Sequence, residues 1–285
     1  MNTNTRIAEF FNFSTKNESI KWKQIIADQH CGYLNKKCIK VRKSEPEISI
    51  GTCTVQYGKE NEEVIICPHR LIEKRKIFLD CMHLLTLHEP GNELHVVSEI
   101  NIPGGSVDYF LVSVRNKKVI DFVGIELQTL DTTGTVWPER QRLLGDLNII
   151  EESEEGYAHK PYGMNWKMTA KTILVQLHHK IETFEYLSKH LVLVLQDHLL
   201  IYMKKEFSFS HLSTTPKLGE AMHFHSYKLG LGDDNNFHID LYERLSTDSA
   251  GIASAMGLNA VAKVELEIII KTIESKISET TILTI

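Results

Sequence analysis

The stretch from Gly104 to Gln128 most constrains the fold, because it has the pattern of a single β-hairpin. Its two strands contain short, strongly apolar runs, Tyr109–Val112 and Val119–Ile125. Such nearly continuous runs are typical of strands that are buried on both faces. The sequence therefore predicts a hairpin of two buried strands.

Three polar side chains interrupt these strands near the open end of the hairpin: Asp108, Glu126 and Gln128. Side chains alternate along a strand, so Glu126 and Gln128 share one face. Residues paired across an antiparallel hairpin also share a face. The relative position of Asp108 then depends on the register of the hairpin.

A loop formed by residues 116–118 would pair Arg115 with Val119. Counting along the ladder from that pair sets Asp108 opposite Glu126. Two carboxylates and an amide are then expected together at the open end of the hairpin.

Two neighbouring carboxylates repel each other unless a cation lies between them or one is protonated. Mg²⁺ binds to such pairs, and waters and phosphate oxygens complete its coordination. A metal at this position can activate water and stabilise the charge that develops on a phosphodiester. The pattern of Asp108, Glu126 and Gln128 resembles the PD-(D/E)xK nuclease signature, with glutamine in place of the usual lysine. The alternative is a surface hairpin with ordinary acidic residues at its end.

Composition places the chain among ordinary globular proteins: 285 residues, 42% of them hydrophobic and 24% charged. No apolar run approaches the ~18 residues of a membrane helix, and the N-terminus lacks the pattern of a signal peptide. We therefore expect a cytoplasmic protein with reduced thiols and no membrane partner. The net charge is −5, but basic residues cluster locally and permit DNA binding. These residues are Lys36, Lys37, Lys40, Arg42, Lys43, Arg70, Lys74, Arg75 and Lys76.

Four cysteines, Cys31, Cys38, Cys53 and Cys67, lie within 37 residues, in a segment too short to form a core of its own. Four thiolates around one tetrahedral zinc or iron would stabilise such a segment. Their spacing contains no CxxC pair, so scattered thiols remain the alternative. Cys81 is expected to be a buried thiol outside any metal site.

The remaining segments predict alternating helices and strands. Helices are expected at residues 4–13, 17–28, 70–87, from 166 or 168 to about 190, and at 258–278. Strands are expected at 94–100 and 191–195, and residues 199–203 form another strand or extend the one at 191–195. Residues 129–165 form an insertion that contains the acidic run 151–155, and residues 211–238 are rich in loops. The last helix carries apolar surface suited to a core or a dimer interface.

Cys67-Pro68-His69-Arg70 after three earlier cysteines, followed by Gly105-Ser-Val-Asp108 and Glu126-Leu-Gln128, resembles the NotI family of type II restriction endonucleases. The resemblance spans roughly residues 30–190. It implies a PD-(D/E)xK core, a mixed sheet flanked by helices, that cleaves DNA with Mg²⁺. It also implies that an iron is held by Cys31, Cys38, Cys53 and Cys67, and that Asp108, Glu126 and Gln128 form the active site.

This interpretation divides the chain into an N-terminal four-cysteine module, residues 1–68, and a nuclease domain, residues 69–285. Asp108 and Glu126 would hold Mg²⁺, and Gln128 would orient the attacking water or bridge to the metal. Glu99, one strand earlier, would add a further acidic group to the site, unless it is a solvated glutamate.

The leading hypothesis is a type II restriction endonuclease that cuts double-stranded DNA as a homodimer at a palindromic site. The alternatives are a non-catalytic DNA-binding protein built on the cysteine site, and a repair or mobile-element nuclease without strict specificity.

Several histidines and lysines are further candidate site residues. His178 and His179 are adjacent on a predicted helix, so they do not face each other. His223, His225 and His238 could bind metal by residue type, but their irregular context does not favour a shared site. Lys160, Lys167 and Lys171 could contact phosphate, although ordinary solvated lysines are commoner at such positions.

Overall fold

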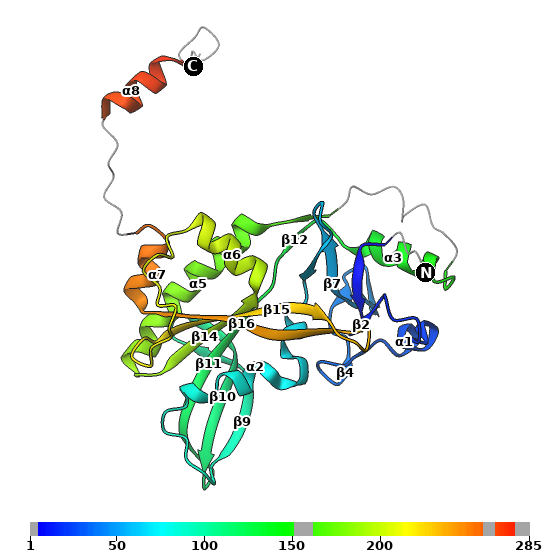
Figure 1. The fold of residues 1–285 in the computed structure, drawn as a ribbon, viewed down its shortest axis with the longest axis horizontal. Helices are drawn as coiled ribbons and strands as arrows, with labels where there is room; N and C mark the ends of the chain where they lie inside the picture. The colour runs from blue at the N-terminus through cyan, green and yellow to red at the C-terminus, as the bar shows by residue number, and fades with distance from the viewer. Residues whose placement is uncertain (1–4, 151–161, 259–265, 277–285) are drawn as a thin grey trace.

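The computed structural model describes residues 5–150, 162–258 and 266–276. In this part of the chain, six strands form a central mixed sheet in the order β16-β15-β14-β11-β10-β9 (Figure 1). The strands are β9 (Glu93–Ile102), β10 (Gly105–Arg115), β11 (Lys118–Gln128), β14 (His190–Gln196), β15 (Met222–Leu231) and β16 (Phe237–Thr247). β14 runs parallel to both β11 and β15, and the other neighbours are antiparallel. The predicted α/β architecture, a mixed sheet flanked by helices, is confirmed.

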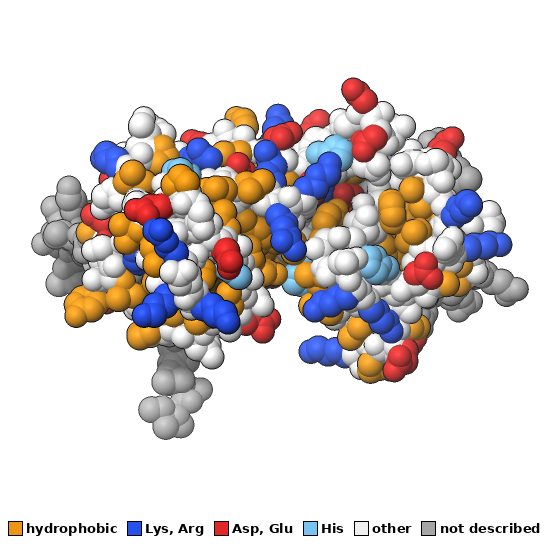
Figure 2. Space-filling model, turned by 90° about the horizontal axis from the view of Figure 1, so that it is seen from below, with side chains coloured by type: hydrophobic (Ala, Val, Ile, Leu, Met, Phe, Trp, Pro, Cys, Tyr) orange, Lys and Arg blue, Asp and Glu red, His pale blue; other side chains and the backbone are white. Residues whose placement is uncertain are grey.

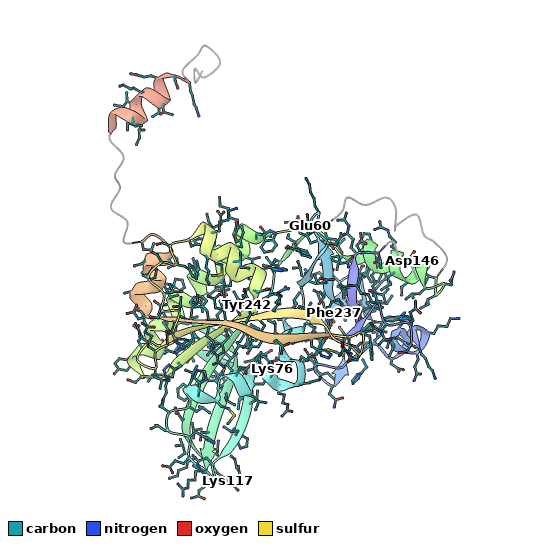
Figure 3. The ribbon with its side chains drawn as sticks, in the orientation of Figure 1. Glu60, Lys76, Lys117, Asp146, Phe237 and Tyr242 are labelled. Atoms are coloured by element: carbon teal, nitrogen blue, oxygen red, sulfur yellow. The ribbon has the colours of Figure 1, made fainter. Side chains whose placement is uncertain are left out.

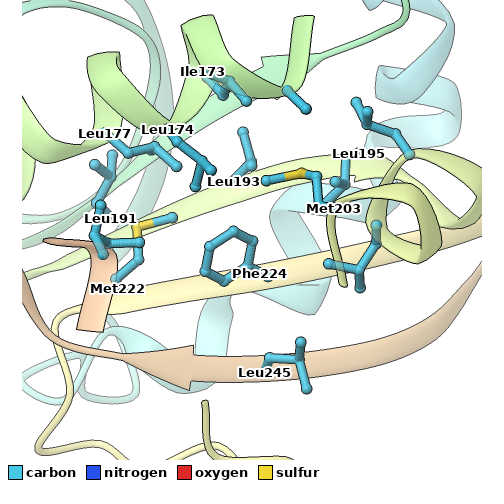
Figure 4. Close-up of a cluster of buried hydrophobic side chains, with 14 of the residues drawn as sticks. Ile173, Leu174, Leu177, Leu191, Leu193, Leu195, Met203, Met222, Phe224 and Leu245 are labelled. Atoms are coloured by element: carbon cyan, nitrogen blue, oxygen red, sulfur yellow. The ribbon is translucent and has the colours of Figure 1, made fainter. Parts of the chain in front are cut away.

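Three helices cover one face of the sheet: α5 (Trp166–Tyr186), α6 (Asp197–Glu206) and α7 (Ser249–Ala255). Figure 4 shows how they bury the centre of that face. Apolar residues recur along α5 at helical spacing, so they form one stripe, and the buried strand β14 lies beneath it. The packed side chains include Ile173, Leu174, Leu177, Leu191, Leu193, Leu195, Met203, Met222, Phe224 and Leu245.

The opposite face of the sheet packs against a broken helical segment rather than the single helix predicted for residues 70–87. The segment consists of the 3₁₀-helix η1 (Pro68–Arg75), the helix α2 (Lys76–Asp80) and the 3₁₀-helix η2 (Met82–Leu84). Lys74 and Arg75 have φ angles of 47° and 57°, which interrupt the helix. The apolar stripe was still informative, because Leu71, Ile77 and Phe78 are buried against the sheet.

The N-terminal region is a second, smaller sheet of order β2-β1-β7-β8. Its strands are β1 (Ile7–Phe10), β2 (Phe13–Ser14), β7 (Thr52–Tyr57) and β8 (Glu62–Ile65). Around it lie α1 (Trp22–Asp28) and the short strands β3 (His30–Cys31), β4 (Lys36–Lys37), β5 (Val41–Arg42) and β6 (Glu45–Ser49). The helix predicted at residues 4–13 was therefore wrong, and the one predicted at 17–28 begins only at Trp22.

The insertion at residues 129–165 contains the strands β12 (Thr132–Thr133) and β13 (Gly163–Met164) and the helix α3 (Trp137–Asp146). Leu143 and Leu144 of α3 pack against Ile7, Phe10 and Phe11 of the N-terminal region. The insertion thus contributes to the N-terminal core. The acidic run at 151–155 lies outside the described residues.

Two further predictions were wrong in the C-terminal half. Residues 199–203 belong to the helix α6 rather than to a strand, and the supposedly loop-rich stretch 211–238 contains the whole of β15. The last helix, α8 (Leu266–Glu274), falls within the predicted range 258–278, part of which lies outside the described residues. None of the described helices is long and apolar enough to cross a membrane.

The outer part of the hairpin projects from the body together with β9 (Figure 1). We call this three-stranded projection, residues 93–99 and 109–123, the arm. Figure 3 places Lys117 at its tip. Seen from below in Figure 2, the surface is hollowed between a lobe that carries the arm and a lobe formed by the N-terminal elements.

Candidate active site

The hairpin register brings Asp108 and Glu126 together by a route that differs from the predicted one. The turn contains only Asn116 and Lys117, so Arg115 pairs with Lys118 rather than with Val119. A bulge between Ser113 and Val114 then shifts the register by one residue.

On the side of the bulge away from the turn, Tyr109 pairs with Ile125, as the predicted register requires. The shorter turn and the extra residue cancel each other. Asp108 and Glu126 therefore occupy the position that follows the Tyr109–Ile125 pair, at the open end of the ladder.

Asp108 is held in place by the backbone of the partner strand. Its Oδ2 atom accepts a hydrogen bond of 2.8 Å from the Leu127 N–H. A carboxylate bonded to a backbone amide is fixed in orientation, and its second oxygen is left for another partner.

Glu126 is buried and forms an ion pair with a lysine from the helix α5. Lys180 Nζ lies 2.6 Å from Glu126 Oε1, and each side chain is only 7% exposed. Burial raises the pKa of Glu126 to about 7, although Lys180 acts in the opposite direction, and the Asp108 carboxylate adds to the increase. Burial of the Glu126 carboxylate therefore outweighs its ion pair with Lys180.

Two glycines allow α5 to approach the hairpin this closely. A Cβ atom on Gly104 would lie 2.0 Å from the carbonyl oxygen of His179, and one on Gly105 would lie 3.1 Å from Lys180 Cε. Gly104 also has a φ of +97°, which L-residues with side chains rarely adopt. The Pro103-Gly104-Gly105 turn thus positions Lys180 over the start of β10.

The sequence analysis missed Lys180, which forms an ion pair with Glu126. A signal for it was present in the sequence. Lys180 sits among the apolar residues Leu177, Ile181 and Phe184, on a stripe that otherwise faces the core. A lysine at such a position needs a buried partner.

The other two predicted residues have different surroundings. Gln128 Nε2 donates a hydrogen bond of 2.6 Å to the carbonyl oxygen of Thr129, so this amide is engaged with its own loop. Glu99 is exposed and has a φ of 55°. It lies between the β9 residues that pair with Val107 and Tyr109, so it faces Asp108 across the β9–β10 ladder.

His69 marks the place where the cysteine segment meets the hairpin. Burial lowers the pKa of its imidazole, and the nearby ammonium groups of Lys36 and Lys40 lower it further. The carboxylates of Asp108 and Glu99 act in the opposite direction. Both the lysines and the acids therefore lie close to one histidine. The Nδ1 atom of His69 is buried and has no hydrogen-bond partner in the described structure.

Cys31, Cys38, Cys53 and Cys67 line one small pocket, with an enclosed space of about 10 Å³. Such a space holds no more than a single small ligand. A hydrogen bond from the Cys53 thiol lowers the pKa of Cys67, and the same bond together with burial raises the pKa of Cys53. Cys81 is separate: it is fully buried in the core, and its sulfur lies 3.7 Å from His225 Nδ1.

The four thiols fit a metal by their chemistry, since thiolates are the ligands preferred by zinc and iron. Among the described residues, however, no three His, Cys, Asp or Glu side chains are arranged so that they could hold a metal ion as they stand. A metal at the cysteines would therefore require the sulfurs to move closer together.

The remaining histidines do not form a common site. Burial lowers the pKa of His223 to about 3 and that of His225 to about 2, so both are neutral core residues. His238 lies between the carboxylates of Glu73 and Asp234, at 2.7 and 3.1 Å, in a surface network. His178 and His179 have ring centroids 6.2 Å apart on neighbouring faces of α5.

The lysines considered for phosphate contact are not brought to the site. Lys167 and Lys171 are exposed on α5, and Lys160 lies outside the described residues.

The chain matches no protein-family model, and no curated protein matches it.

Proposed function

We propose that this protein is a Mg²⁺-dependent endonuclease that cuts double-stranded DNA, in the manner of a type II restriction endonuclease. The observation that carries the proposal is the cluster of Asp108, Glu126 and Lys180 at the open end of the hairpin. Its parts are a backbone-held carboxylate, a buried glutamate and a buried ammonium group 2.6 Å from that glutamate.

Each residue would have a separate task in phosphodiester hydrolysis. Asp108 and Glu126 would hold a Mg²⁺ ion, which supplies Lewis-acid activation of water and of the phosphate when bound. Lys180 would place its positive charge beside the phosphate oxygens, where charge develops in the transition state. Gln128 is neutral and would orient the attacking water.

Lys180 removes a difficulty in the sequence pattern. PD-(D/E)xK sites ordinarily carry a lysine two residues after the second acid, and this chain has Gln128 there. A lysine from α5 reaches the same glutamate from the adjacent helix. The positive charge that the pattern lacks is thus available from another element.

The surroundings of the site favour DNA as the substrate. Lys36 and Lys40 lie near His69, on the side of the site formed by the cysteine segment. Figure 2 shows Lys and Arg side chains on both sides of the hollow between the two lobes. Basic side chains near a carboxylate pair suit a polyanion that binds and reacts there.

Three further parts of the proposal derive from the resemblance to the NotI family. The fold is a PD-(D/E)xK core, and Cys31, Cys38, Cys53 and Cys67 hold an iron, or a zinc, with a structural role. The protein acts in the cytoplasm as a homodimer at a palindromic sequence.

Incubation of plasmid DNA with the protein and Mg²⁺ tests the proposal. Discrete fragments are expected, and they would disappear when Mg²⁺ is chelated. Smearing or nicking would indicate a nuclease without strict site specificity. DNA binding without any cleavage would leave only the DNA-binding alternative.

A further inference from the structure

The tip of the arm carries a dense and exposed positive charge. Arg115, Lys117 and Lys118 supply three cations within four residues, and all three are exposed. Arg115 is 3.1 Å from Glu89, but both side chains are more than half exposed, so this pair is weak and can be exchanged for another anion. The tip is therefore free to meet a negatively charged partner.

The arm is fixed to the body by buried polar contacts that the proposed active site does not use. Asp121 is 1% exposed, accepts a hydrogen bond of 2.8 Å from the Leu87 N–H, and pairs with Lys189 at 2.6 Å. A buried carboxylate with both oxygens satisfied holds its strand in one position.

A second set of contacts lies one strand away, at the buried hydroxyl of Ser113. Its Oγ lies 2.9 Å from His88 Nδ1 and 3.1 Å from Asn92 Nδ2. The loop at residues 85–92 thus braces two strands of the arm. The projection is a stiff element, and a partner bound at its tip is held at a fixed place relative to the body.

The bulge beside Ser113 directs the tip. It adds one residue to β11 between the braced part of the arm and the turn. Bulges bend a strand and increase its local twist, so they re-aim whatever follows. The turn itself is a tight two-residue connection, with φ angles of 50° at Asn116 and 63° at Lys117.

The length of the arm matches DNA. Arg115 follows Asp108 by seven positions, which span about 24 Å in a strand, or about two thirds of a turn of B-DNA. Beyond the Glu93–Val114 pair, only β10 and β11 of the described strands continue to the tip, and a two-stranded β-ribbon fits the major groove. We propose that the arm lies along the duplex and that its tip enters a groove within one helical turn of the phosphodiester held at Asp108 and Glu126. This inference rests on the proposed function.

A double variant tests the assignment, Lys117→Ala with Lys118→Ala. Its matched control is Lys21→Ala with Lys23→Ala, two exposed lysines at α1, on the far side of the N-terminal lobe (Figure 1). Binding to duplex DNA is measured without divalent cation between about 50 and 200 mM salt. The arm variant should bind at least about tenfold more weakly, and its slope of log K against log salt should fall by about two, one for each lost phosphate contact. The control should bind as the unmodified protein does.

The outcomes separate the two proposals. If the unmodified protein neither binds nor cuts DNA, the proposed function fails. If it binds and cuts but the arm variant has the same affinity and salt slope, the arm proposal alone fails. If the arm variant instead loses binding to vesicles of anionic lipid while its DNA binding is unchanged, the arm proposal also fails. Phosphate-ethylation interference should map the contacts that the arm variant loses to within about ten base pairs of the cut, and a more distant position would contradict the geometry.

Discussion

Lys180 Nζ and Glu126 Oε1 lie 2.6 Å apart, with both side chains almost completely buried. The pair joins the helix α5 to the strand β11. Among the hydrogen bonds of the described residues, it is the only one between a predicted catalytic carboxylate and a lysine. A buried cation next to a buried acid is costly to maintain for stability alone, because both groups lose their hydration. Under the proposed function, its position at the end of the hairpin would give it a task in catalysis.

Lys180→Met should lower DNA cleavage by about 10²- to 10³-fold, because it removes a charge aimed at the developing phosphate charge. The affinity for DNA should change little, since the group is buried. Lys171→Met, on an exposed position of the same helix, is the matched control and should leave the rate nearly unchanged. Single-turnover cleavage and gel-shift assays on both variants measure this. A Lys180→Met protein that folds and cuts at the normal rate would exclude the lysine from the mechanism.

The sequence predicted the centre of this arrangement because its constraints are local. Two apolar strands, a turn and alternating side chains place Asp108 and Glu126 together, and the alternation depends only on strand geometry. The predicted turn was one residue too long and the bulge was missed, and these two errors cancelled. Agreement at Asp108 was therefore partly fortunate.

The parts that could not be predicted depend on contacts between distant segments. Lys180 reaches Glu126 because Gly104 lets α5, about 75 residues further along the chain, pack closely against the turn. No local sequence pattern encodes this close approach of two distant segments. The segment at 7–10 is apolar and short, so periodicity alone could not separate a strand from a helix. It becomes a strand because it pairs with β7.

Gly104→Ala should destabilise the protein by more than about 2 kcal/mol, because the new Cβ would collide with the His179 carbonyl and the positive φ would be strained. Gly219→Ala is the control: Gly219 is exposed, and a Cβ there meets no atom within 4 Å. Its effect should stay within about 0.5 kcal/mol. Urea unfolding measures both changes. Equal stability of the two variants would refute the close contact between α5 and the turn.

If the proposed metal site is present, Cys53→Ser should reduce the iron or zinc content of the purified protein well below one metal per chain and lower its melting temperature, since the site would lose one of its four ligands. Cys81→Ser should keep its metal, because Cys81 lies in the core away from the four-cysteine pocket. Elemental analysis after dialysis distinguishes the two. If the unmodified protein contains no metal, or both variants retain it, the cysteine site does not bind metal.

Stability should fall as the pH drops below about 6.5, because His223 and His225 are buried in their neutral form. Their folded-state pKa values are lowered to about 3 and about 2, whereas an unfolded histidine titrates near 6.5. Below pH 6.5 the unfolded chain takes up protons that the native protein excludes, so the free energy of unfolding decreases toward acid pH. At pH 5 the loss should be about 2 kcal/mol for each histidine.

The variant His223→Gln with His225→Gln should flatten this pH dependence, whatever its absolute stability. His95→Gln changes an exposed histidine and should leave the slope as it is. Urea unfolding at pH 7 and pH 5 gives the slopes. An unchanged slope in the double variant would assign the acid sensitivity to other groups.

Cleavage of duplex DNA by the unmodified protein and by Glu126→Gln, side by side with Mg²⁺, tests the central claim most directly. The substitution keeps the size of the side chain and removes the charge that would hold the metal, so folding and DNA binding should persist. The account predicts discrete fragments from the unmodified protein and a loss of at least about 10³-fold in rate for the variant, with equal retention of DNA in a gel-shift assay. Cutting by Glu126→Gln at the normal rate, or the absence of any Mg²⁺-dependent cleavage by the unmodified protein, would contradict it.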